Sequence, residues 1–405
     1  MKKVPTFFSL FLFLPFSIFA QCVEDTNGQF IDLNGGPCLN TIVTAVPFLD
    51  IETNPQSVGL AGIGVVASPF NYSTALSQNP ALLMRDKEVL DVQVSYMPWL
   101  RRLEVDNVRF LDFRFGASLD KRQAVGLNIT HFSFGEISFI DPNGNPIGSG
   151  SPEEYNISGH YARQLSPAWS IGMGFNYFVS DLASGLVVAG QPIGKATSFA
   201  LDFGVHHQKK FLFKNQDKLH WNVGLSVINL GPKISYFENS LNGDFIPSSL
   251  KLGTLFTYEK AIKSNTLYFS LAYQANKLLV PSPCLGPNCD LDNNGIPDHR
   301  EQSVISAAIN SFSDAPNGAS EEWAEFTHHI GMESWWVFSK PYRVGLRGGY
   351  FSESITKGGR KYYSVGASFN FHNFAFNFGH IFSAKSASFA FIDTFSVGVG
   401  YNRIL

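Results

Sequence analysis

Acidic side chains are concentrated in one stretch of the chain, where their spacing matches a calcium-binding loop. Residues 290–301 read DLDNNGIPDHRE, which fits the pattern D-x-D-x-[DN]-G-x5-E in full. Calcium prefers oxygen ligands, and a glycine at the sixth position allows the sharp turn that brings both halves around one ion. We expect a structural Ca2+ held by Asp290, Asp292, Asn294, the backbone carbonyl of Ile296, Asp298 directly or through water, and bidentate Glu301. A solvated acidic loop without metal is the alternative.

The cysteines lie near this loop and near the start of the chain. There are four of them, Cys22, Cys38, Cys284 and Cys289, and four cysteines can pair in three ways. Closeness in sequence favours Cys22 with Cys38 and Cys284 with Cys289. The second bridge would fix the entrance of the acidic loop, and both would persist at an oxidising cell surface. Zinc binding is the alternative, but no Cys/His cluster has the spacing that it requires.

The segments that must position these residues alternate between apolar and polar side chains. In residues 361–371, the odd positions from Tyr363 to Phe371 are apolar, and the residues between them are small or polar. About fourteen such segments predict an all-β fold, a transmembrane antiparallel β-barrel, because lipid allows no open sheet edge. The expected strands are 89–97, 107–119, 123–135, 153–165, 168–181, 195–208, 218–229, 248–258, 265–276, 323–338, 341–352, 361–371, 373–382 and 391–404. A soluble β-sandwich alternates in the same way and is the alternative.

The connections between these strands predict how the barrel sits in a membrane. Short ones are expected at 120–122, 166–167, 339–340 and 372, and long ones at 136–152, 182–194, 230–247 and 277–322. Outer-membrane barrels have short periplasmic turns and long external loops. We therefore expect an outer-membrane protein with extracellular long loops and with both chain ends in the periplasm.

The chain divides into three parts. Residues 1–20 carry Lys2 and Lys3, then an apolar stretch and Ala20, as in a signal peptide. Residues 21–88 are too irregular for a strand and, around 59–67, too apolar to remain exposed to water. We expect them to fold into the lumen of the barrel, residues 89–405, as a plug; a periplasmic linker is the alternative.

Charged side chains on one face of two neighbouring strands are candidates for a lumen cluster: His329, Glu333, Arg343 and Arg347. We expect lumen-filling ion pairs, because barrel interiors are polar; a ligand or proton site is the alternative. Trp336, on the opposite face, is expected in an interfacial aromatic girdle.

Composition and motifs argue against two other classes of function. The net charge of −3 gives no basic patch to hold nucleic acid. The chain has no G-x-S-x-G or HExxH motif, and His328 and His329 point to opposite faces of a strand. We therefore expect that the protein is not an enzyme.

Four blocks of sequence resemble a known family. Residues 57–62 (SVGLAG) followed by 79–81 (NPA) resemble the N-terminal plug of FadL-like outer-membrane proteins; the positions concerned are Gly59, Gly62, Asn79, Pro80 and Ala81. Residues 96–101 (YMPWLR), 314–322 (DAPNGASEE) and 357–362 (KGGRKY) narrow the resemblance to the PorV (LptO) family of the Bacteroidetes type IX secretion system. The likeness spans nearly the whole chain after residue 20.

This resemblance implies a function that composition cannot give. PorV-like barrels bind the C-terminal signal domains of secreted cargo at the SprA-type translocon and pass them to the PorU-type sortase complex at the cell surface. The lumen would be plugged, and the external loops, above all 277–322, would bind. A FadL-like transporter of hydrophobic small molecules is the second reading, and a lipid-modifying enzyme, suggested by the name LptO, is a third. A transporter requires an apolar lumen pocket, whereas a cargo carrier requires ordered external loops.

Overall fold

The computed structural model describes residues 23–24, 30–31, 38–66, 70, 76–84, 89–99, 107–140, 144–188, 190–237, 243–285, 288–338, 342–383 and 394–404. The expected signal peptide, residues 1–20, and Cys22 lie outside this part of the chain. No helix among the described residues is long and apolar enough to cross a membrane.

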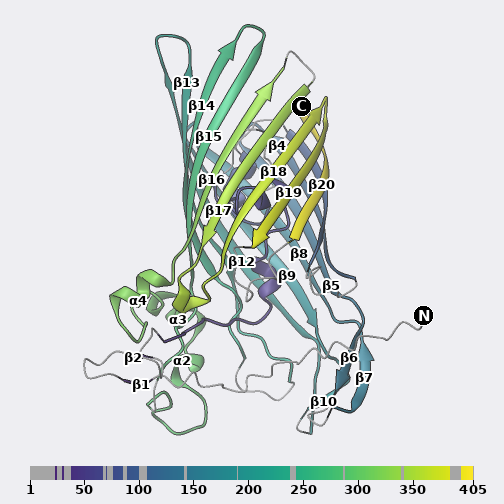
Figure 1. The fold of residues 1–405 in the computed structure, drawn as a ribbon, viewed down its shortest axis with the longest axis vertical. Helices are drawn as coiled ribbons and strands as arrows, with labels where there is room; N and C mark the ends of the chain where they lie inside the picture. The colour runs from purple at the N-terminus through teal and green to yellow at the C-terminus, as the bar shows by residue number, and fades with distance from the viewer. Residues whose placement is uncertain are drawn as a thin grey trace, which may run out of the picture.

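Antiparallel strands form one closed barrel of fourteen (Figure 1). In chain order they are β3 (Val89–Pro98), β4 (Val108–Asp120), β5 (Gln123–Phe134), β8 (Glu153–Ser166), β9 (Trp169–Asp181), β12 (Ala196–Leu212), β13 (Lys218–Leu230), β14 (Ser249–Ile262), β15 (Asn265–Leu278), β16 (Thr327–Val337), β17 (Tyr342–Ser352), β18 (Lys361–Phe371), β19 (Phe374–Ser383) and β20 (Thr394–Ile404). The last strand pairs with the first, from Ile404 opposite Val89 to Val397 opposite Tyr96. This closure leaves no unpaired edge in the sheet, and the count confirms the prediction.

Several strand boundaries were predicted wrongly. β12 and β14 continue to Leu212 and Ile262, beyond the predicted ends at 208 and 258. The strand expected from residue 323 begins at Thr327, because Ala319–Ala324 forms the helix α4. Its sequence, ASEEWA, has good helix-forming residues, and Glu321 and Glu322 lie in its first turn, where carboxylates interact favourably with the helix dipole.

The outer surface of the barrel has an apolar band between two sets of aromatic side chains. Near the long loops, exposed tyrosines project outward from several strands: Tyr96, Tyr155, Tyr177, Tyr273 and Tyr363. Near the short turns lie exposed Trp169 and Trp336, as predicted for Trp336. Aromatic rings of this kind mark the two membrane–water interfaces of a barrel.

The chain before β3 lies inside the barrel, where Figure 1 shows it enclosed by strands. This inner segment, residues 47–66 and 76–84, contains η1 (Pro47–Asp50), α1 (Pro55–Val58) and η3 (Pro80–Met84). Asn54 caps α1 by accepting hydrogen bonds from the backbone N–H groups of Gln56 and Ser57. Most of its side chains are buried; that this segment acts as a plug stays a prediction.

Glycines in the wall make room for the inner segment. A Cβ on Gly224 would lie 2.0 Å from the carbonyl oxygen of Val65, and one on Gly172 would lie 2.4 Å from the carbonyl carbon of Pro80. Asn79, in the NPA block, donates hydrogen bonds to the carbonyl oxygens of Val65, at 2.9 Å, and Val205, at 3.1 Å. The backbone of the segment therefore packs directly on the strands.

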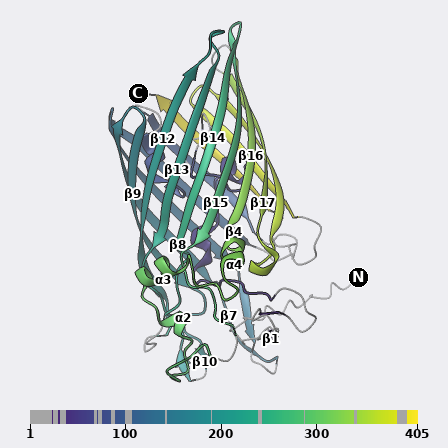
Figure 2. The ribbon, with the colours of Figure 1, turned by 90° about the vertical axis from the view of Figure 1, so that its left-hand side faces the viewer.

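The long connections gather at one end of the barrel, as the two views in Figures 1 and 2 show. They contain the hairpins β6 (Ile137–Ile140)–β7 (Pro146–Gly150) and β10 (Val187–Val188)–β11 (Gln191–Pro192), the helices α2 (Asp298–Glu301), α3 (Val304–Asn310) and α4, and η5 (Ile355–Lys357). A further short pair, β1 (Val23–Glu24)–β2 (Phe30–Ile31), precedes the inner segment. We call this the long-loop end and the other the short-turn end.

Asn40, early in the described chain, and the end of β20 lie at opposite ends of the barrel. Asn40 donates its backbone N–H to Thr356 O at 2.8 Å and its side chain to Pro283 O at 3.1 Å, both at the long-loop end. β20 finishes beside the start of β3 at the short-turn end. The side of the membrane on which the two chain ends lie stays a prediction.

Candidate functional site

A network of buried charges fixes the longest loop to the barrel rim. Lys277, near the end of β15, has a side chain with no solvent exposure. Its Nζ lies 3.3 Å from Glu322 of α4 and forms a closer ion pair with Glu325, just after α4. These ion pairs therefore link the strand residue before the 279–326 connection to the residues at the end of that connection.

A second lysine joins the same carboxylates from another loop. Lys357, in η5 between β17 and β18, lies 2.5 Å from Glu321 and 2.9 Å from Glu325. Asn40 donates a further hydrogen bond to Glu321 at 2.9 Å. Two of the family-like blocks, 314–322 and 357–362, therefore meet here, together with the residues that lead into the inner segment.

One carboxylate of the network lacks a cation. Asp314 accepts the backbone N–H of Ser282 at 3.2 Å, while its Oδ1 is buried without a hydrogen-bond partner. Burial raises the pKa of Asp314 from 3.8 to about 6, and the nearby Glu325 and Glu322 carboxylates add to the rise. At Glu321, by contrast, burial raises the pKa, but the hydrogen bonds from Lys357, Asn317 and Asn40 and the charge of Lys357 together outweigh it, so the pKa is lowered.

These shifts predict that the loop loosens as the pH rises. The contribution of Asp314 to stability is fully present below pH 3.8 and is lost as the pH rises through about 6. Asp314→Asn should abolish this loss and stabilise the loop at pH 8 by about 1–2 kcal/mol, allowing for solvent screening. Limited proteolysis of residues 279–326 at pH 5 and pH 8 measures the effect. Equal pH dependence in parent and variant would show that Asp314 is not responsible.

The acidic loop lies beside this network. Carboxylate oxygens of Asp290, Asp292 and Asp298 lie within 4.8 Å of one another. Asp290 accepts the backbone N–H groups of Asn294, at 3.1 Å, and of Gly295, at 2.8 Å, and Gly295 has a φ of +85°. Glu301 is brought near by accepting a hydrogen bond from the Asn294 side chain at 2.8 Å. Ile296 is the remaining predicted ligand; its N–H bonds to Asn294 Oδ1.

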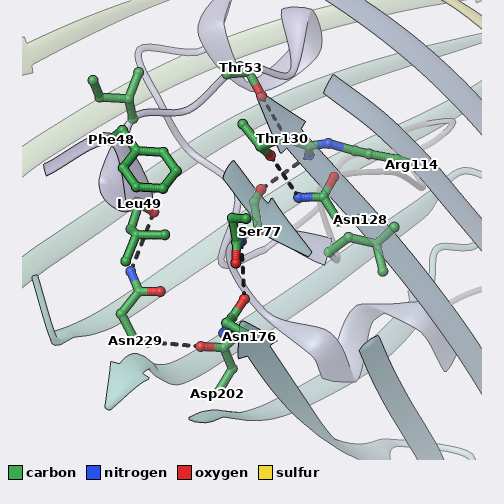
Figure 3. A pocket seen from close by; sticks show the side chains of 13 residues that line it. Phe48, Leu49, Thr53, Ser77, Arg114, Asn128, Thr130, Asn176, Asp202 and Asn229 are labelled. Carbon is green, nitrogen blue, oxygen red and sulfur yellow. Dashed lines mark hydrogen bonds between the residues drawn. The ribbon is translucent and has the colours of Figure 1, made fainter. Parts of the chain in front are cut away.

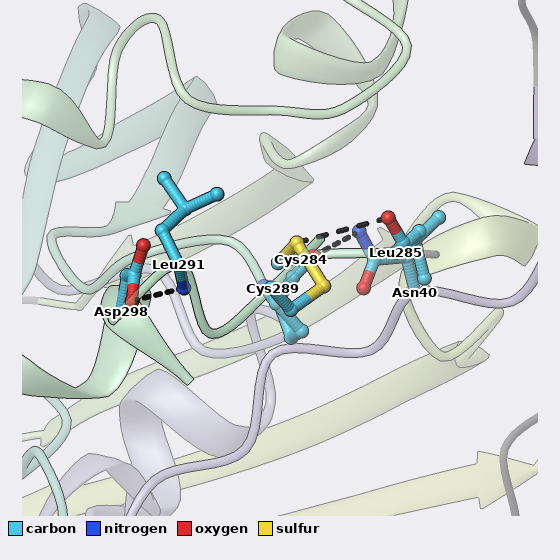
Figure 4. Close-up of a disulfide and its surroundings, with 7 residues drawn as sticks. Asn40, Cys284, Leu285, Cys289, Leu291 and Asp298 are labelled. Carbon is cyan, nitrogen blue, oxygen red and sulfur yellow. Dashed lines mark hydrogen bonds between the residues drawn. A yellow bond between two sulfur atoms is a disulfide. The ribbon is translucent and has the colours of Figure 1, made fainter. Parts of the chain in front are cut away.

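A disulfide between Cys284 and Cys289 immediately precedes the loop and confirms that predicted pair (Figure 4). Cys38 is also disulfide-bonded, while Cys22, its expected partner, lies outside the described residues. On its other side the loop contacts the connection between β13 and β14, because Lys233 donates to Arg300 O at 2.6 Å and Arg300 pairs with Asp244.

The four predicted lumen residues face the barrel interior but do not form one cluster. Glu333 and Arg347 form a buried ion pair at 2.9 Å. His329 bonds instead to Ala61 O of the inner segment at 2.6 Å. Arg343 is not in the ion pair as predicted, since its guanidinium lies 4.6 Å from the ring centre of Phe70.

Sequence reasoning missed a second lumen cluster around Arg114. This buried arginine contacts Asp112 at 2.5 Å and Glu52 of the inner segment at 3.1 Å. The sequence does carry a signal for this cluster. Asp112 and Arg114 are two charged residues on the same face of one strand. Beside it lies a cavity of about 30 Å³ (Figure 3), lined partly by Asn128, Asn176 and other polar residues. A volume of this size holds about two water molecules.

The long-loop end thus offers an ordered surface, and comparisons with known proteins identify the family. Solved structures to which the chain is similar include a Pseudomonas aeruginosa FadL homologue (TM-score 0.41, 11% identity, 90% of this chain and 99% of that chain). They also include the Pseudomonas putida toluene transporter TodX (TM-score 0.43, 10% identity, 87% and 97%). A search of curated proteins found no match. The family model "Type IX secretion system protein PorV" matches residues 38–285, more than half of the chain, and the chain belongs to that family.

Proposed function

We propose that this protein is a non-enzymatic carrier of secreted cargo in the outer membrane. It binds C-terminal signal domains at the SprA-type translocon and passes them to the PorU-type sortase complex. The observation that carries the proposal is the long-loop end, where a disulfide and the Lys277 and Lys357 ion pairs hold the longest loop in one arrangement. A rigid surface loses little conformational entropy on binding. In this proposal the long loops are extracellular.

The lumen favours this function over transport of hydrophobic small molecules. The inner segment packs on wall glycines that leave no space for an added Cβ. The cavity beside Arg114 is lined mainly by polar residues and has a volume of about 30 Å³, whereas sites for small apolar ligands measure about 300–1,000 Å³.

A binding experiment tests the proposal. The purified full-length chain in detergent is mixed with a soluble protein fused to a cargo C-terminal signal domain, and with the same protein lacking that domain as the matched control. Capture of the fusion alone is expected. Capture of neither, together with uptake of long-chain fatty acid by cells that express the chain, would favour the transporter instead.

We also propose that residues 290–301 bind Ca2+. Three carboxylates already converge, and the full twelve-residue calcium pattern is present. The ion would neutralise their repulsion and order the loop that contacts Lys233 and Asp244, which supports a structural rather than a catalytic role.

Replacing one of these carboxylates should weaken calcium binding. Asp292→Asn removes a charged ligand, and we expect the affinity to fall by about tenfold or more. Calorimetric titration of the chelator-treated chain with CaCl2 measures the change, and Glu136→Gln, at an exposed site of another long loop, is the control. If parent and both variants show no calcium-dependent heat, the loop is a solvated acidic turn.

A further inference from the structure

The outward face of α3 and α4 carries large apolar side chains that the described part of the chain leaves uncovered. Ile305, Ile309 and Phe312 are spaced four and three residues apart, which places them on one side of a helix and its continuation. Their exposed fractions are 60%, 68% and 48%, and that of Trp323 on α4 is 71%. We call these four residues the apolar patch. Contiguous exposed apolar surface usually marks a contact site.

The patch stands on a rigid support. Ser303 caps α3 by accepting the backbone N–H of Ser306 at 3.2 Å. The opposite side of the helix buries Ala307, and Ser311 after it is buried too. α4 is held by the ion pairs of Lys277 and Lys357. The apolar patch therefore lies on a rigid part of the surface.

The patch continues the lipid-facing wall of the barrel. The ring of Trp323 lies 5.5 Å from that of Phe326, which directly precedes β16. Lys277 Nζ lies 5.7 Å from the ring centre of Phe312 and 5.5 Å from that of Phe326, and so joins the end of α3 to the start of β16. Ile330 and Met332 are the exposed outward residues that follow on β16.

The interface between lipid and water falls next to the patch. Tyr273 of the aromatic girdle bonds to His328, at the start of β16, at 2.8 Å. In Figure 1 α4 lies outside the outline of the barrel, and Figure 2, in which that side faces the viewer, shows α4 below β15. A side chain that projects from this position meets the surface of the bilayer.

We propose that the apolar patch lies on the membrane, with Ile305, Ile309 and Trp323 inserted among the lipids around the long-loop end. Two observations favour lipid over a protein as the occupant: the patch is continuous with the lipid-facing band, and it includes a tryptophan, which prefers the interface. Short amphipathic helices bind bilayers in this way. The inference does not depend on the proposed cargo function.

Spin labels on two faces of α3 test the proposal. In the oxidised full-length chain, where Cys38, Cys284 and Cys289 are disulfide-bonded, Ile309→Cys introduces a thiol for a nitroxide. Asn310→Cys places one on the neighbouring exposed polar face. The labelled proteins are reconstituted in phosphatidylcholine liposomes. We expect oxygen, which is soluble in lipid, to relax the label at 309 several-fold more than a water-soluble nickel complex does, and the reverse order at 310.

A second measurement needs no label. Brominated phosphatidylcholine should quench the fluorescence of Trp323, taken as the difference between the parent and Trp323→Phe. Equal nickel accessibility at 310 and 309, with an unquenched Trp323, would overturn the proposal. Shielding of residue 309 only after another protein is added would make the patch a protein-binding surface and would equally overturn it.

Discussion

Lys277→Met is expected to release the longest loop from the barrel rim. The lysine side chain has no solvent exposure and contacts both Glu322 and Glu325. Methionine would keep its packing volume while leaving Glu322 without its cation and Glu325 with Lys357 alone. Breaking a buried ion pair from one side costs about 3–5 kcal/mol. Residues 279–326 should become sensitive to protease, and binding of cargo signal domains should fall with them.

A surface pair at the same end of the barrel provides the control. Lys195 lies 2.8 Å from Asp181, but its side chain is 59% exposed, and exposed pairs contribute about 0–1 kcal/mol. Lys195→Met should therefore leave protease resistance unchanged. If the two variants behave alike, the Lys277 network does not hold the loop.

Gly224→Ala is expected to open the lumen. The added Cβ would lie 2.0 Å from the carbonyl oxygen of Val65 and 3.2 Å from the side chain of Asn79. Because backbone cannot yield as a flexible side chain can, the inner segment must move, at a cost of about 1–3 kcal/mol. Planar bilayer recordings should show more frequent and larger open events than the parent chain gives.

Gly159→Ala is the matched control, because a Cβ at Gly159 on β8 meets nothing within 4 Å. It should leave conductance as in the parent. Unaltered conductance in Gly224→Ala, with the barrel still folded by its heat-dependent mobility on gels, would mean that the inner segment is not what closes the pore.

Strand positions were predictable from sequence because the two-residue period is repeated around the whole barrel. β17 and β18 were expected at 341–352 and 361–371 and span Tyr342–Ser352 and Lys361–Phe371. Near Trp323 the apolar–polar alternation of β16 happens to extend back into α4, so the strand was predicted to begin too early. Helix-forming residues and the acidic side chains in the first turn of α4 determine the structure there.

Charge partners were less predictable because they come from segments far apart in the sequence. The inward positions of Glu333 and Arg347 follow from alternation. Arg343 instead contacts Phe70, which belongs to the stretch before β3, where the sequence has no periodic pattern. The same applies to Lys277 and Lys357, which share Glu325 although they lie on opposite sides of it in the chain. Local patterns identify a face of a strand; they do not identify which loop folds over its end.

The inner segment also constrains how the molecule is assembled. The seam of the barrel joins the first strand, β3, to the last, β20, so the wall cannot close until β20 has been delivered to the membrane. The chain before β3 is held at the long-loop end through Asn40 and continues inside the barrel as the inner segment. If the seam closed first, this segment would have to be threaded through a lumen with little free space. If the segment folds against an open, curved sheet, that step is avoided. The last strands can then pack around the segment as a template.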